Sequence, residues 1–443
     1  MNPLQQTDEH IKVLGRQTAA RVRQRLTAAR LTKGAQMVQR LGQSHQVGVH
    51  RAPPRRVPWA HATSQSAPHC STLLTKPLFH RLFVLLPRRR RSGRANAIEP
   101  SDRCRPRVRP PEAPMTRLVV GTYAARGGPG LIPITDDGGD WTVGEPFAAI
   151  RNASFGIASP RHGLHYLVDE QAGTLGVYDA RRDWTTIADV GTGGAAPCHL
   201  ALSPDETLLA IAHYESGTIA LFDLNAAGRP AARRIFANTG RGPDSERQRG
   251  PHAHWVGFTP SGALQCVDLG TDAIVVRDAA DRNATRIAYA APAGSGPRHL
   301  AAHPTLPLQY LVSELAATLT VLRPQGQHLI AERIVPTGPQ DAETDNLGGG
   351  LAITGDRLYV SNRGADTIAT FALDDTGTPH RLGDVASGGQ SPRFVLPLER
   401  HLVVAHEEGG GVAIHALDTE GRPQPDPIRL DIPGAAFVMI DPR

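Results

Sequence analysis

The sequence is poor in cysteine and has no long apolar run, and each shortage excludes a class of protein. The chain has four cysteines, Cys70, Cys104, Cys198 and Cys266. They form no CxxC pair and have neither the spacing of a zinc site nor that of a disulfide framework. Such usage is typical of a reducing compartment, so we expect a cytoplasmic protein. No apolar run approaches the roughly 18 residues that span a bilayer, and the candidate Leu82 to Leu86 is flanked by Arg81 and Arg88. We therefore expect no membrane association.

Glycine and proline, in contrast, are abundant. The 443 residues include 45 Gly and 37 Pro, well above the roughly 12% that the two types contribute on average. This composition excludes a long-helix architecture. It favours either a large all-β domain with an appendage or about two to three domains of ordinary size.

The net charge of +6 is distributed very unevenly along the chain. Residues 1–114 contain 22 Lys and Arg against 5 Asp and Glu, which leaves 26 basic and 37 acidic residues in 115–443. The basic excess is therefore confined to a segment rich in Pro and Arg. The larger part of the chain is acidic, so we expect it to bind no nucleic acid.

Residues 1–114 contain no pattern that predicts a hydrophobic core. Low hydrophobicity with high net charge is typical of disorder, so we expect a disordered basic extension. A wrongly assigned start, with Met115 as the first residue of the native protein, is a second interpretation. A targeting or nucleic-acid-binding arm is the third.

From Met115 to Arg443 a unit of three short strands recurs every 40 to 55 residues or so, which is the spacing of propeller blades. Its turn prolines, Pro160, Pro204, Pro260 and Pro304, lie 44, 56 and 44 residues apart. The second strands of six clear units cover 164–170, 208–214, 264–269, 309–314, 358–363 and 402–407. Residues 436–440 supply the inner strand of a seventh unit, whose next strands are 118–123 and 130–134. The sequence therefore predicts an all-β, seven-bladed β-propeller over 115–443, closed by joining its two ends.

In such a blade the start of the first strand and the end of the second lie on the same face of the disc. Strand starts bring His252, His254, Arg298 and Arg393 to this face, together with His199 and His299, which we place at positions equivalent to His254. Second-strand ends bring Glu170, Tyr214, Asp268, Glu314, Asn362, Arg363 and Glu407. Ionisable groups therefore gather at one mouth of the central channel.

Structural roles compete with functional ones at several of these positions. Asp268 and Asp272 belong to an Asp-Leu-Gly-Thr-Asp segment that is typical of an Asx turn. Arg298 and Glu314 are sixteen residues apart in one unit and could form a structural ion pair. Beyond His252 and His254 no metal-ligand spacing is present, so we expect no metal and no cofactor.

Nine short motifs in 115–443 occur in an order that resembles the seven-bladed lactonase family of bacterial 6-phosphogluconolactonases and fungal 3-carboxymuconate lactonizing enzymes. They include Gly121-Thr122-Tyr123, Pro251-His252-Ala253-His254, Gly296-Pro297-Arg298-His299 and Ser391-Pro392-Arg393-Phe394. The chain departs from the family pattern at Ala212-His213-Tyr214 and Ala405-His406-Glu407. The resemblance implies an active site at the channel mouth built from His252 or His254, Arg298, Glu314 and Arg363.

The favoured function is hydrolysis of a sugar-acid lactone, with 6-phosphogluconolactone preferred among small anionic substrates. Attack of water on the ester needs a base, for which Glu314, His252 and His254 are the candidates. Arg298 would stabilise the oxyanion. Substrate binding falls to Arg363 and Arg393, as anchors of a phosphate or carboxylate, and to His199 and His299.

Two functions of other classes use the same residues differently. A cycloisomerase of the muconate-lactonizing type would hold an unsaturated dicarboxylate with the same arginines and move a proton with Glu314 or a histidine. A non-enzymatic propeller scaffold is disfavoured, because Gly-His and Trp-Asp repeat signatures are absent and charged residues converge at one mouth.

Overall fold

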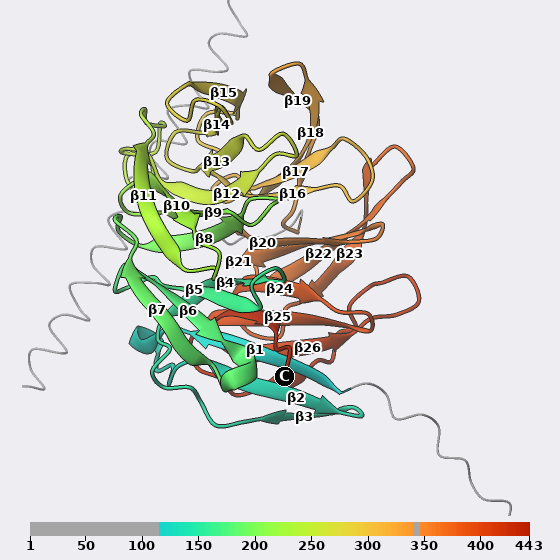
Figure 1. The fold of residues 1–443 in the computed structure, drawn as a ribbon. Helices are drawn as coiled ribbons and strands as arrows, with labels where there is room; N and C mark the ends of the chain where they lie inside the picture. The colour runs from blue at the N-terminus through green and yellow to red at the C-terminus, as the bar shows by residue number, and fades with distance from the viewer. Residues whose placement is uncertain (1–114, 340–345) are drawn as a thin grey trace, which may run out of the picture. The chain divides into compact units, whose positions relative to one another are not determined.

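The computed structural model describes residues 115–339 and 346–443. The extension expected over residues 1–114 lies outside the described residues. Within the described ranges the chain forms seven four-stranded antiparallel sheets, arranged as the blades of a propeller (Figure 1). The predicted fold class is therefore confirmed.

Six blades are built from consecutive strands, with the inner strand first. Three of them are β4 (Ala153–Ser159) to β7 (Thr185–Gly191), β8 (Pro197–Leu202) to β11 (Pro230–Ala237), and β12 (Ala253–Phe258) to β15 (Thr285–Ala290). The other three are β16 (Pro297–Ala302) to β19 (His328–Pro336), β20 (Leu347–Thr354) to β23 (Pro379–Ala386), and β24 (Gln390–Pro397) to β27 (Ile428–Leu430). Their second strands are β5 (Leu164–Asp169), β9 (Leu208–His213), β13 (Leu264–Asp268), β17 (Gln309–Ser313), β21 (Arg357–Arg363) and β25 (His401–Gly409). Their third strands are β6 (Thr174–Asp179), β10 (Thr218–Leu224), β14 (Ala273–Arg277), β18 (Thr318–Gln325), β22 (Thr367–Leu373) and β26 (Val412–Ala416).

The seventh blade combines both ends of the described chain, as predicted. Its inner strand β28 (Ala435–Ile440) pairs with β1 (Thr116–Thr122), which is followed by β2 (Ile132–Asp137) and β3 (Asp140–Val143). Val120 lies opposite Val438 in this pairing. Joining the two ends in one sheet closes the ring and removes the exposed edges of an open array.

The hydrophobic core lies between neighbouring blades and is formed mainly by the first three strands of each, with a few residues such as Trp141 on β3 and Leu329 on β19 from fourth strands. Tyr166 and Val168 on β5, for example, belong to one buried cluster with Leu200 on β8 and Ile211 on β9. The fourth strands are largely exposed, and apolar residues on them, such as Ile235 on β11 and Ile330 on β19, are exposed as well. Because these strands bury little apolar surface, the sequence predicted three strands a blade and missed the fourth.

Helical structure in the described residues is limited to two 3-10 turns, η1 (Ala124–Arg126) and η2 (Ala180–Arg182). No helix in these residues has the length and apolar character needed to cross a membrane.

The inner strands carry a β-bulge close to the channel mouth. In β16, Pro297 lies opposite Ser313 and His299 opposite Val312, so Arg298 is the extra residue. Bulges place His254 in β12, Cys198 in β8 and Arg393 in β24 in the same way. Because a bulge redirects the side chain of the extra residue, this register gives four blades equivalent positions for functional groups.

Candidate active site

The bulges correct one prediction about the histidines. His199 lies opposite Ala212 and His299 opposite Val312, and the equivalent residue of β12 is Trp255, opposite Val267. His254 is instead equivalent to Arg298, at the bulge. The sequence could not separate these positions, because an extra residue shifts the register without changing the apolar pattern.

In four blades the second strand contributes the residue that follows its last paired residue, namely Glu170, Tyr214, Leu269 and Glu314. In the other two blades Arg363 is itself paired, with Leu347, and Glu407 lies between the paired residues His406 and Gly409. The residue before each one has a structural role instead. The Asp268 carboxylate, for instance, accepts hydrogen bonds from the backbone N–H groups of His252 and Thr271, as an Asx turn requires.

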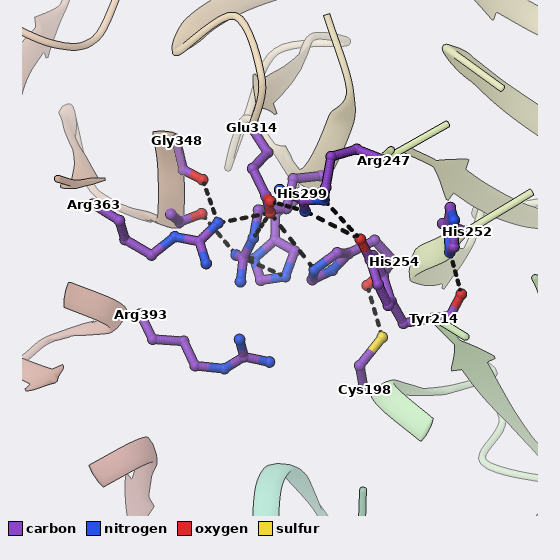
Figure 2. A network of polar contacts seen from close by, with 12 residues as sticks. Cys198, Tyr214, Arg247, His252, His254, His299, Glu314, Gly348, Arg363 and Arg393 are labelled. Atoms are coloured by element: carbon purple, nitrogen blue, oxygen red, sulfur yellow. Dashed lines mark hydrogen bonds and ion pairs between the residues drawn. The ribbon is translucent and has the colours of Figure 1, made fainter. Parts of the chain in front are cut away.

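Glu314 is the centre of the polar network at the mouth (Figure 2). Its Oε2 lies 2.9 Å from Arg298 Nε and 2.7 Å from Arg363 Nη2, while its Oε1 lies 2.5 Å from Arg247 Nη2. His254 Nε2 is 4.0 Å from Oε2. The ion pair between Arg298 and Glu314 considered from the sequence is therefore part of a larger cluster.

These contacts determine the charge states of the cluster. Burial by itself raises the pKa of Glu314, but Arg363 and Arg298 outweigh it and hold that pKa well below the usual range. Burial, followed by the positive charge of Arg363, lowers the pKa of Arg298 to about 10. The cluster thus contains an ionised carboxylate and a guanidinium whose charged form is destabilised by burial and by neighbouring positive charge.

Arg298 is 1% exposed, and most of its donors are used by the protein. Its Nη1 donates to the carbonyl of Gly349 at 2.8 Å and lies 3.3 Å from His299 Nε2. A Cβ at position 349 would lie 2.4 Å from Ser361 Oγ, so glycine is needed for this close approach. Among the described residues, Arg298 Nη2 has no hydrogen-bond partner.

Arg393 approaches the cluster from the side opposite Glu314 (Figure 2). Its Nη1 lies 3.2 Å from Glu407 Oε2, and its Nη2 lies 3.6 Å from Glu170 Oε2. The guanidinium also lies over the Tyr123 ring, 5.4 Å from its centroid. Glu407 Oε1 in turn lies 3.4 Å from Arg363 Nη1, so the carboxylates flank the arginines.

His254 is buried, and its imidazole is neutral. Burial, and then the charge of Arg298, lower the pKa of His254 well below its ordinary value of 6.5. Its Nδ1 has no hydrogen-bond partner among the described residues. His254 is therefore a neutral imidazole close to an ionised carboxylate, and a neutral imidazole is the form that a general base needs.

His252 lies outside this cluster. Its ring stacks on Tyr214 with 4.6 Å between ring centroids, and Tyr214 also meets the His254 ring edge-on at 5.5 Å. His252 Nδ1 is 2.7 Å from the Tyr214 carbonyl oxygen, to which it donates. Tyr214 thus lies between the two histidines.

His199 and His299 line the channel one residue further along the inner strands. The His299 ring centroid is 5.2 Å from that of His254 and 5.6 Å from that of His199. Burial lowers the pKa of His199 to about 3, and burial with the nearby Arg298 lowers that of His299 well below 6.5. Both line a cavity of about 440 Å³ with Trp255, Phe155 and Phe394.

A second cavity, of about 710 Å³, opens beside the cluster at the mouth. It is lined by Asp244, Arg247, Leu315, Asn346, Leu347, Arg363, Gly364, Asp366, Gln390, Ser391, Glu407 and Glu408. Its volume lies within the range of small-molecule sites. No group of three or more His, Cys, Asp or Glu side chains in the described ranges could hold a metal ion.

Sequence reasoning missed Arg247, which comes from the loop between β11 and β12. A signal for it was present. The spacing from Pro204 to Pro260 is 56 residues where the neighbouring spacings are 44, so the loop is an insertion into the repeat. An insertion at the functional face of a repeat protein is a place to look for specific contacts.

Comparisons with known proteins agree with the propeller fold. The family model described as lactonase, 7-bladed beta-propeller, matches residues 117–439. The chain is 29% identical over 327 residues to the 6-phosphogluconolactonase of Bacillus subtilis, covering 69% of this chain and 93% of that protein.

Solved structures also match the propeller fold. A periplasmic gluconolactonase of Pseudomonas aeruginosa superposes with a TM-score of 0.67 at 25% identity, covering 74% of this chain and 99% of that one. A protein from Lactobacillus plantarum has the same TM-score, identity and coverage. The match over residues 117–439 shows that this chain belongs to the seven-bladed β-propeller lactonase family.

Proposed function

We propose that the protein hydrolyses a sugar-acid lactone at the channel mouth, with 6-phosphogluconolactone as its preferred substrate. One observation carries the proposal. Three largely buried guanidiniums, of Arg298, Arg363 and Arg393, converge beside the neutral His254, with only Glu314, Glu407 and the more distant Glu170 as their carboxylate partners. Such an arrangement favours negative charge that develops on a bound ester.

The reaction can be written with these groups. His254 Nε2 takes a proton from water as the water oxygen bonds to the lactone carbonyl carbon. The carbonyl oxygen gains negative charge, which Arg298 stabilises through Nη2, the nitrogen without a protein partner. When the ring C–O bond breaks, the leaving oxygen receives the proton from His254. The product is an open-chain hydroxy acid, which ionises and releases one proton to neutral buffer.

We assign the role of base to His254 and not to Glu314, which the sequence left as an alternative. Both oxygens of Glu314 are held in ion pairs, with Arg247 at Oε1 and with Arg298 and Arg363 at Oε2, so neither is free to take a proton from water. A carboxylate 4.0 Å from His254 Nε2 is, however, well placed to stabilise the imidazolium that forms. These observations support His254 as the base and Glu314 as its electrostatic partner.

Hydrolysis is favoured over the cycloisomerase and scaffold alternatives because of the relatives. The Bacillus subtilis protein is named 6-phosphogluconolactonase and the Pseudomonas aeruginosa protein gluconolactonase. The latter is described as periplasmic, whereas Cys198 and Cys266 of this chain are unpaired thiols. We place the reaction in the cytoplasm on that ground.

Proton exchange by the purified full chain tests the proposal. The assay follows proton release from 6-phosphogluconolactone and from unphosphorylated gluconolactone, and proton uptake with a carboxymuconate, whose ring closure turns a carboxylate into an ester. Each rate is corrected for the spontaneous reaction in the same buffer. We expect the highest kcat/KM for 6-phosphogluconolactone. Activity on the carboxymuconate alone would support the cycloisomerase, and activity on none of the three would support a scaffold.

A further inference from the structure

Arg247 differs from the other arginines at the mouth in origin and in exposure. It comes from the inserted loop of residues 238–252, whereas Arg298, Arg363 and Arg393 come from blade strands. Its side chain is 36% exposed, against 12% for Arg363 and 14% for Arg393. Arg247 is therefore the guanidinium of the cluster that an incoming ligand meets first.

The contacts of Arg247 leave part of its guanidinium free. Nη2 lies 2.5 Å from Glu314 Oε1 and donates to the Tyr214 hydroxyl oxygen at 3.1 Å, and Nε donates to the same oxygen at 3.4 Å. In the part of the chain that the structure describes, Nη1 has no hydrogen-bond partner. A guanidinium fixed along one edge and free at the other nitrogen is suited to bind an anion.

The loop that carries Arg247 is held in place by buried hydrogen bonds. The Gln248 side chain is fully buried, and its Nε2 donates to the Leu269 carbonyl and to Asp272 Oδ1, both at 2.8 Å. Asp244 Oδ1 accepts from the backbone N–H groups of Glu246 and Arg247, also at 2.8 Å. The position of Arg247 at the mouth is thus fixed by the hydrogen bonds of an ordered loop.

Arg247 and Arg363 both line the 710 Å³ cavity at the mouth. Arg363, which the sequence suggested as an anion anchor, already contacts Glu314 and Glu407 and is held between them. The acidic side chains of the cavity wall also have partners. Asp366 accepts from the Ser391 N–H at 2.8 Å, and Glu407 accepts from the Ser391 hydroxyl at 2.8 Å; Glu408 lies 3.6 Å from Arg126.

We propose that Arg247 binds the phosphate at the end of the lactone remote from the reacting ester, in the mouth cavity, and so sets the preference for a phosphorylated substrate. The inference rests on the proposed function. It transfers to Arg247 the role of anion anchor that the sequence suggested for Arg363 and Arg393. Asn346, Gln390 and Ser391, on the same cavity wall, offer neutral polar groups for the hydroxyls of the sugar chain.

Steady-state kinetics of Arg247→Ala test the proposal with two substrates. Loss of a charge-assisted contact to phosphate corresponds to roughly 10-fold to 100-fold in binding. We expect KM for 6-phosphogluconolactone to rise by about that factor with kcat nearly unchanged, and both constants for gluconolactone to change by less than about threefold. Arg247→Gln, which removes the charge but keeps a donor near Tyr214, should behave in the same way.

Arg249→Ala is the matched control. Arg249 belongs to the same loop and carries the same charge, but it is exposed, its Nε donates to the Ser245 carbonyl, and it does not line the cavity. This variant should show wild-type constants for both substrates. A fall in kcat for both substrates with Arg247→Ala would overturn the proposal and make Arg247 a positioning residue for Glu314. Wild-type constants would place it outside the site.

Calorimetric titration with the product separates this inference from the proposed function. Binding of 6-phosphogluconate should weaken at least tenfold in Arg247→Ala, while binding of gluconate should not change. The titration needs no turnover. A chain that hydrolyses no lactone would fail the proposed function, and equal weakening for both ligands would fail the role of Arg247.

Discussion

Glu314 is the residue on which the geometry of the mouth depends. One carboxylate holds three guanidiniums, from two blade strands and the inserted loop. The repeat pattern in the sequence predicts that Glu314 lies at the mouth, but it does not predict what Glu314 does there. Only the contacts show that its carboxylate is ionised and that both of its oxygens are held by arginines. We therefore propose for Glu314, a base candidate from the sequence, the role of an electrostatic partner.

Replacing Glu314 with Gln should lower the stability of the fold as well as the rate of the reaction. The variant leaves Arg298 and Arg363 close together and buried without their shared counter-ion. Removing one partner of a buried ion pair costs about 3 to 5 kcal/mol. Urea unfolding should show a loss of that size, and added phosphate should recover more stability in the variant than in the wild type. Unchanged stability with lost activity would instead return Glu314 to the role of base.

Replacing His254 with Asn should remove the proton acceptor and leave the packing of the mouth in place. General-base catalysis contributes about 10² to 10⁴ in rate, so kcat should fall by that factor. Thermal unfolding serves as the check on folding. His252→Asn, on the far side of Tyr214, should lose much less activity; the reverse order would assign the base to His252.

The pH dependence of the rate follows from the low pKa of His254. A base is active when unprotonated, so its contribution is lost as the pH falls through its own pKa. Because burial and Arg298 lower that pKa well below 6.5, kcat/KM should stay level as the pH falls from 8 to 6. A decline centred near pH 6.5, the ordinary histidine value, would show that the base is another, solvated histidine.

At the scale of the element, the strands were predictable and their bulges were not. Apolar runs such as 208–214 and 264–269 specify β9 and β13 closely. The extra residue in β12 leaves the same run intact while placing His254, and not Trp255, at the mouth. Hydrophobic periodicity therefore determines the blade, whereas backbone hydrogen bonding at the bulge determines which side chain joins the site.

The inserted loop gives a prediction of its own. Gln248→Ala removes the two buried hydrogen bonds that tie the loop to Leu269 and Asp272. Amide exchange should become faster across 238–252 and stay unchanged in β16 and β17. KM for the phosphorylated lactone should rise, since Arg247 is then less well positioned. Unchanged exchange would show that other contacts hold the loop.

At the scale of the whole molecule, seven-fold repetition brings groups from distant parts of the sequence to one axis. Tyr123, in the first described loop, reaches Glu170 at 2.7 Å and contacts Arg393 near the other end of the chain. The repeat pattern predicted this convergence, because each blade presents the same two positions to the mouth. Arg247 was not predictable in this way, since a loop insertion follows no repeat.

The same architecture buries histidines throughout the propeller, which makes its stability sensitive to acid. Burial lowers the pKa of His199 to about 3 and those of His213 and His406 to about 4. These folded-state values lie below the unfolded value of 6.5, so the unfolded chain binds more protons as the pH falls below 6.5. Each histidine then costs up to about 1.4 kcal/mol per pH unit.

We therefore expect the free energy of unfolding to be level between pH 8 and 7 and to fall steeply between pH 6.5 and 4.5. Glu314 contributes little in this window, because its own stabilisation is lost only below its ordinary pKa of 4.5. Urea unfolding at half-unit pH steps measures the slope. A level free energy from pH 7 to 5 would contradict the neutral, buried state of these histidines.

The central claim is that the arginine cluster at the mouth hydrolyses a sugar-acid lactone. Arg298→Ala tests it most directly, because Glu314 keeps Arg363 and Arg247 as partners in the variant and is not left unpaired. With the wild-type chain, proton release from 6-phosphogluconolactone should greatly exceed the spontaneous rate. In the variant kcat should fall by about 10²-fold or more. The melting temperature of the variant should stay close to that of the wild type. A wild-type rate equal to that of buffer, or equal turnover by the two proteins, would contradict the account.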